Sequence, residues 1–194
     1  MRPTVRLTLA AALIAAAAPP VLAQQPAAPA AGASTITADL LMDVEDLERK
    51  MLALARAIPA DKYGYRPGAG VRSVGEVLLH VAADNYLLPA ALGHAADPAT
   101  GIKGDDFKTA QAFERRQLNR DSTLAELQRS FAHLKTGLAS TSAARLAQPV
   151  SMFGQPSTVQ RMWVLTTTHL HEHLGQLIAY ARSNGVAPPW SQGG

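Results

Sequence analysis

A proline-free run of 26 residues, 158–183, constrains the fold of this chain more than any other segment. Apolar residues recur in it at steps of three and four, which is the spacing of one helix face. The run is far longer than a usual β-strand, and Asn184 and Gly185 followed by Pro188 form a typical helix stop. We therefore expect a long helix over 158–183. Its expected inner positions are Val159, Met162, Thr166, His169, His173, Gln176 and Tyr180.

Three earlier segments show the same apolar spacing. The first begins near Thr37, a candidate cap, and the second begins at Ser73 and Glu76, which have the form of a capping box. The third has Asp121 or Ser122 as its cap. The chain is thus predicted to contain four long helices. The apolar positions of the first three are Leu40, Val44, Leu47, Met51 and Leu54; Val74, Val77, Leu78, Val81 and Leu88; and Leu124, Leu127, Phe131, Leu134 and Leu138.

The connection between the second and third helices, residues 93–122, is unusually long for a helical bundle. A connection of this length can cross the bundle, so the two helices it joins can run parallel. We expect a short extra helix around 106–118 within it. The predicted fold is all-α, a four-helix bundle with a long crossover between helices two and three, in one domain over 37–190.

The first 23 residues have the pattern of a secretory signal peptide. Arg2 and Arg6 precede an apolar run over 7–18, which is too short to cross a bilayer, and a small-residue cleavage site ends at Ala23. Residues 24–36 are rich in Ala and Pro and are predicted to form a flexible linker. With no cysteine for a lipid anchor, we expect a periplasmic or secreted protein without a membrane anchor.

Charge gives little support to a nucleic-acid partner. The formal net charge of +3 falls to +1 once the two signal-peptide arginines are removed, so no basic surface is indicated. We expect a small-molecule partner rather than nucleic acid, and the sequence leaves a homodimer open.

His169 and His173 are the chemically most informative pair. On a helix, four residues separate two side chains by about 40° and about 6 Å, so both imidazoles can hold one metal ion. A pair of hydrogen-bonded core histidines fits the spacing equally well, and both interpretations stay open. His171 is expected to point away into solvent, and His171-Glu172 does not continue into the His-Glu-x-x-His pattern of zinc proteases.

The other histidines carry weaker signals. His80 lies on the second predicted helix, and taken alone it is more simply an ordinary surface or core residue. Glu76 and Asp84 lie one helical turn to either side of it, where either can reach a metal or orient the imidazole. For Glu76 we favour the capping box. His94 and His133 are expected in a loop and on an outer helix face.

Three stretches, 58–67, 73–82 and 169–189, together resemble the DinB-like (DinB/YfiT-like) family of metal-dependent enzymes. The resemblance covers nearly all of 37–190. It implies a four-helix bundle in which His80, His169 and His173 bind one divalent metal ion. Many members have an arginine where this chain has Leu174, which leaves any role of that arginine without a counterpart. The family name does not imply DNA binding.

Two classes of function are consistent with the sequence. In the first, the protein is an exported metalloenzyme, a thiol-dependent transferase or a hydrolase, because the resembled family includes bacillithiol transferases and mycothiol-dependent maleylpyruvate isomerases. Ligation by histidine alone suits zinc, nickel or iron and disfavours calcium and magnesium. In the second, the protein is a non-catalytic metal-binding or stress-related bundle. No nucleophile or general base is evident beside the histidines.

Overall fold

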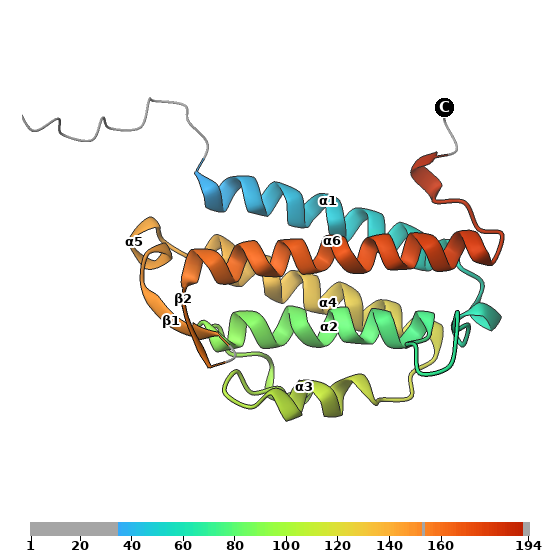
Figure 1. The fold of residues 1–194 in the computed structure, drawn as a ribbon, viewed down its shortest axis with the longest axis horizontal. Helices are drawn as coiled ribbons and strands as arrows, with labels where there is room; N and C mark the ends of the chain where they lie inside the picture. Colours follow the sequence, from blue (N-terminus) through green and yellow to red (C-terminus); the bar gives the residue numbers. More distant parts are fainter. Residues whose placement is uncertain (1–34, 153, 192–194) are drawn as a thin grey trace, which may run out of the picture. The chain divides into compact units, whose positions relative to one another are not determined.

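A computed structural model describes residues 35–152 and 154–191. Four long helices dominate it, as predicted: α1 (Ile36–Ala57), α2 (Val74–Ala91), α4 (Arg120–Ala139) and α6 (Val159–Ser183) (Figure 1). The expected signal peptide and nearly all of the expected linker lie outside the described residues. Within the described part of the chain, no helix is both long and apolar enough to span a membrane.

The four helices form a bundle in which α1 and α2 each pack against α4 and α6. The predicted parallel pair is present, because α2 and α4 run in the same direction (Figure 1). The Tyr86 hydroxyl of α2 donates to Glu126 early in α4, and Gly137 late in α4 lies against Pro89 near the end of α2. The helices α1 and α6 run in the opposite direction to this pair.

The crossover from α2 to α4 contains the short helix α3 (Phe107–Glu114), which packs against α2. The predicted extra helix is therefore present, although it ends earlier than position 118. The loop before α3 passes very close to the end of α2, since a Cβ on Gly104 would lie 2.3 Å from the carbonyl carbon of Ala90. Glycine at this position sets how closely α3 lies against α2.

Two predicted helix caps were wrong by a few residues. The α1 helix is capped by Thr35 rather than Thr37. The α4 helix is capped by Asn119, before the predicted Asp121 or Ser122. In both helices the side-chain oxygen accepts a hydrogen bond from the backbone three residues later, so several neighbouring polar residues compete for the role. The capping box predicted for α2 is present with both of its hydrogen bonds.

A β-hairpin between α4 and α6 was not predicted. After the one-turn helix α5 (Ala143–Leu146), β1 (Pro149–Met152) pairs antiparallel with β2 (Gln155–Thr158). Each strand has four residues, too few for an alternating pattern to be distinguished from a loop. Short 3₁₀ helices, η1 (Ala60–Lys62), η2 (Pro98–Thr100) and η3 (Pro189–Ser191), complete the described elements.

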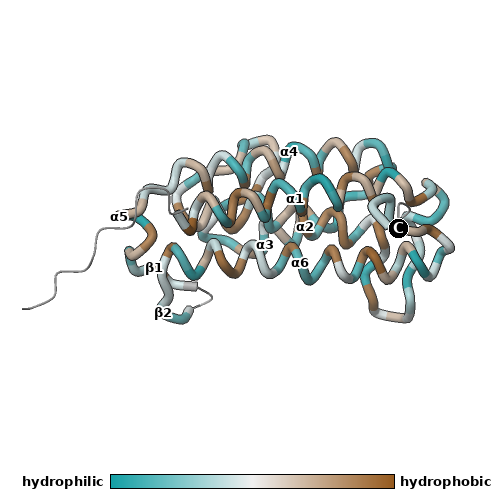
Figure 2. The backbone as a smooth tube through the Cα atoms, turned by 90° about the horizontal axis from the view of Figure 1, so that it is seen from above, coloured by the Kyte–Doolittle hydropathy of each residue, from teal (hydrophilic) through white to brown (hydrophobic). Residues whose placement is uncertain are grey.

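Burial differs sharply between the helices. Apolar and polar residues are interspersed along α1 and α6 (Figure 2), as expected for helices with one apolar face and one polar face. The α2 helix is instead buried on nearly all sides, because α3, α4 and α6 all pack against it. Its buried residues include His80, Asp84 and Asn85, so polar side chains lie inside the bundle and need partners there.

Candidate metal centre

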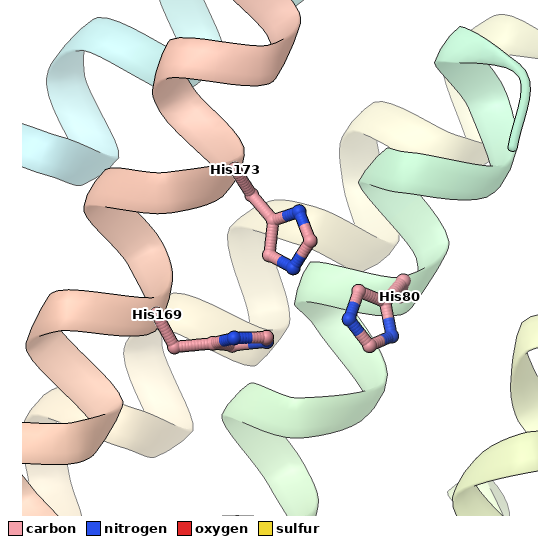
Figure 3. A group of neighbouring side chains, drawn as sticks. All are labelled: His80, His169 and His173. Atoms are coloured by element: carbon pink, nitrogen blue, oxygen red, sulfur yellow. The ribbon is translucent and has the colours of Figure 1, made fainter. Parts of the chain in front are cut away.

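Three imidazoles meet in the interior of the bundle, as predicted from the resemblance (Figure 3). His80 comes from α2, and His169 and His173 come from successive turns of α6. One nitrogen of each ring lies within 4.8 Å of the others. The ring centroids are 4.3 to 5.2 Å apart. This convergence is close enough for one ion to contact all three rings.

The other histidines stay apart from this cluster. His171 is exposed, as predicted, and its Nδ1 atom lies 2.9 Å from the Thr167 carbonyl oxygen one turn back. His94 lies in the loop after α2, also as predicted. His133 was expected on an outer face, but it is half-buried with its ring centroid 5.4 Å from that of Tyr86.

His80 is oriented by a carboxylate from the crossover. Its Nδ1 lies 2.8 Å from Glu114 Oε1, and Arg72 donates to the other oxygen of Glu114 at 3.0 Å. Partial burial raises the pKa of Glu114, but the hydrogen bond from His80 and the positive charge of Arg72 outweigh it and leave this pKa lowered. An ionised Glu114 holds the proton of His80 on Nδ1 and leaves Nε2 free as a metal ligand.

His173 is oriented by an amide. Its Nδ1 donates to Gln176 Oε1 at 2.9 Å, and Gln176 in turn donates to the Tyr180 hydroxyl at 2.8 Å. Burial lowers the pKa of His173, which favours the neutral ring. Its Nε2 is buried without a hydrogen-bond partner among the described residues and points toward the other two rings (Figure 3). A buried lone pair in this position fits a metal ion.

Asp84 is the carboxylate in the midst of the cluster. Its Oδ2 lies 2.8 Å from Nε2 of His169 and 3.5 Å from Nε2 of His80. Asp84 is buried, so it contacts the two imidazoles largely shielded from water. Of the two acidic residues that flank His80, Asp84 therefore reaches the site. Glu76 caps α2 and pairs with Arg66 instead, as the capping-box interpretation predicted.

A hollow of about 280 Å³ opens beside the cluster. It is named the metal-side hollow here, and two of the three histidines form part of its wall. Its lining residues are His80, Asp84, Leu87, Leu88, Phe107, Leu165 and His169. A metal ion at the histidines would thus face a space in which a small molecule can bind. The Asp84 carboxylate lies in the wall of the same space.

A comparison with sequence-family models identifies the family of this chain. The model described as the DinB superfamily matches residues 44–177. The chain belongs to the DinB superfamily. The matched range includes all three histidines and Asp84. No curated protein sequence matches the chain.

Several solved structures share the fold. A conserved protein from Enterococcus faecalis is 16% identical with a TM-score of 0.65, covering 77% of this chain and 97% of that one. YfiT from Bacillus subtilis, described as a probable metal-dependent hydrolase with an unusual four-helix bundle topology, is 14% identical with a TM-score of 0.63, covering 83% and 95%. A mycothiol-dependent maleylpyruvate isomerase is 14% identical with a TM-score of 0.61, covering 75% of this chain but only 63% of that one.

Sequence reasoning missed part of this superfamily member's site. Glu114 and Arg72 were not singled out, although the helix that carries Glu114 was expected. Asp84 was considered only for its helical spacing from His80. The spacing rule placed Asp84 on the correct face, but no sequence pattern indicates that Glu114 meets a histidine 34 positions away.

Proposed function

We propose that this chain is an exported metal-dependent hydrolase in which His80, His169 and His173 hold one divalent ion. The observation that carries the proposal is the position of Asp84, which contacts two of these imidazoles and also lines the metal-side hollow. The three rings supply nitrogen donors, and the hollow supplies a space for substrate.

Three neutral imidazoles suit zinc, nickel or iron(II). The unpartnered Nε2 of His173 and the Glu114-bound ring of His80 both fit this donor set. When bound, such an ion lowers the pKa of water and polarises a carbonyl group. Each of the three rings would bind the ion through a nitrogen that carries no proton, because a ligating imidazole must offer a lone pair.

Asp84 then acts as the general base. Its carboxylate accepts a proton from the attacking water, whose oxygen bonds to the carbonyl carbon of an ester or amide. The bond from that carbon to the leaving oxygen or nitrogen breaks, and the proton passes to the leaving group. Asp84 is buried, and Leu87 and Leu88 line the same hollow, so this carboxylate lies largely shielded from bulk water.

The Asp84 carboxylate also favours hydrolysis over thiol transfer. A thiol bound to a metal is deprotonated by the ion itself and needs no base beside it. The description of YfiT as a metal-dependent hydrolase agrees with this choice, while the mycothiol-dependent isomerase makes thiol transfer the alternative.

Metal content tests the ligands. Substitution of any one of His80, His169 and His173 by alanine should abolish stoichiometric metal binding, because metal ligands act as a set. The metal content is measured in protein purified after zinc loading. His171→Ala is the matched control and should keep full metal content, since it lies on the same helix but faces solvent. Equal metal loss in the control would refute the assignment.

Turnover tests Asp84. Asp84→Asn should retain zinc but lower the rate of hydrolysis of p-nitrophenyl esters by about 100-fold or more, the usual contribution of a general base. The esters are assayed with and without added thiol. Turnover that requires the thiol would establish transfer in place of hydrolysis.

Export belongs to the same proposal and rests on the pattern of residues 1–23. Cell fractionation should recover a mature protein, shortened by the signal peptide, outside the cytoplasm. Full-length protein in the cytoplasmic fraction would contradict it.

A further inference from the structure

A second hollow adjoins the metal-side hollow at shared wall residues. Its volume is about 210 Å³, and it shares Leu87, Leu88 and Phe107 with the metal-side hollow. Beyond these three its walls come from the end of α2, the loop before α3, the β-hairpin and the start of α6. These residues are Ala91, Gly104, Asp105, Ser151 and Met162. The two hollows together are called the apolar groove.

The groove is mainly apolar away from the histidines. Leu87, Leu88, Leu165 and Met162 line it, and Phe107 is 46% exposed at its edge. Among the described residues that line the groove there is no lysine or arginine. Its two carboxylates, Asp84 at the histidines and Asp105 in the second hollow, would repel an anion.

Positive charge is found elsewhere on the same bundle. Arg116 and Arg129 line a hollow on the α4 side, and Arg72 and Arg115 line another beside Glu114. The lack of cationic side chains in the groove is thus a local property of the surface that leads to the metal site, and it bears on which substrates can reach that site.

We propose that the apolar groove binds the hydrocarbon chain of a neutral substrate, with the reacting carbonyl at the histidine cluster. The substrate class is an uncharged ester or amide with an aliphatic acyl group. This inference rests on the proposed function for the reaction, but the recognition of the chain depends only on the groove. The lack of lysine and arginine in these walls, together with Asp84 and Asp105, disfavours anionic substrates such as dicarboxylates.

The test measures binding rather than turnover. Linear alkyl hydroxamates, which carry a metal-binding head group, are titrated into the zinc-loaded full protein by calorimetry. Each added methylene should tighten binding about three- to fourfold until the groove is filled, the ratio expected for about 0.8 kcal/mol per buried methylene. Affinity that does not change with chain length would overturn the proposal.

Variants of residues that line the groove test whether the dependence of affinity on chain length arises there. Phe107→Ser and Leu165→Gln should weaken the dependence on chain length without changing zinc content, because one residue is exposed and the other half-buried. Met42→Ser is the matched control, since Met42 is 60% exposed on α1 and lines neither hollow.

A charged ligand tests the preference for neutral substrates. A hexanoyl hydroxamate with a carboxylate at its far end should bind at least tenfold more weakly than the hexanoyl hydroxamate without it. Tighter binding of the anion would refute the inference.

A further measurement separates the groove from the reaction. N-hexylacetamide, which has no metal-binding group, is added to the metal-free protein, and the NMR signals of Leu87, Leu88 and Leu165 are followed. Saturable shifts at these residues, with none in Met42, support the groove even if no ester is hydrolysed. Absence of shifts would refute the groove even if the protein proved to be a hydrolase.

Discussion

Two imidazoles of the centre are held by carboxylates and the third by an amide. His80 meets a carboxylate that is itself bound by an arginine, His173 meets an amide, and His169 meets Asp84. A carboxylate raises the basicity of the ring it binds more than a neutral amide does. The three ligands are therefore expected to depend unequally on their supports, with His173 depending least on the charge of its partner.

Glu114→Gln should lower the affinity for zinc by about 10- to 100-fold, since glutamine can still accept a hydrogen bond from His80 but carries no charge. The measurement is competition for zinc with a chelator of known affinity. Glu126→Gln is a matched control, because Glu126 is also a carboxylate bound by arginine but has no hydrogen bond to His80, His169 or His173. It should cost stability of the fold, roughly 1–3 kcal/mol, while zinc affinity stays unchanged. Equal loss of affinity in both variants would show that Glu114 has no specific role.

The sequence indicated the site residues to different extents, for physical reasons. Local geometry alone made His169 and His173 a pair, because helical spacing fixes their relation. His80 was included only through the family resemblance, since its approach to the pair depends on how α2 packs against α6. Glu114 needed the complete course of the crossover, which no local pattern describes.

At the level of elements, helix positions were predictable and helix ends were less so. The spacing of apolar residues reflects burial along a whole face and tolerates local ambiguity, which is why all four long helices were found. A cap depends on one hydrogen bond, and at the start of α4 three neighbouring polar residues, Asn119, Asp121 and Ser122, compete for it. The hairpin was missed because its strands are too short to show a period.

Two glycines make the packing of the elements testable. Gly175 lies on the exposed face of α6, where an added Cβ would meet nothing within 4 Å. Gly175→Ala should therefore stabilise the protein by about 0.5–1 kcal/mol, the helix preference of alanine over glycine. Gly104→Ala should destabilise it, because the new Cβ would collide with the backbone of Ala90. Urea unfolding measures both, and a destabilised Gly175→Ala variant would contradict the assigned environment.

For the bundle as a whole, the direction of the helices determines which residues can meet. With α2 antiparallel to α6, position 80 lies level with 173 and position 84 lies level with 169, so the histidines and Asp84 gather within about one turn of each helix. The long crossover permits this arrangement by carrying the chain back across the bundle before α4. Its length was evident in the sequence, and the parallel pair was correctly predicted from it.

A metal ion held by His80, His169 and His173 would link α2 to α6 in the folded state only. Binding of the ion should therefore stabilise the whole bundle. At free zinc about 1,000-fold above the dissociation constant, the gain is about 4 kcal/mol. For a domain of this size it corresponds to a rise in Tm of roughly 8–16 °C. Calorimetry of the chelator-treated protein with and without zinc measures the rise. His171→Ala should show the same zinc-induced rise and His173→Ala none, whatever their metal-free Tm values. A full rise in His173→Ala would mean that zinc stabilises the bundle at another site.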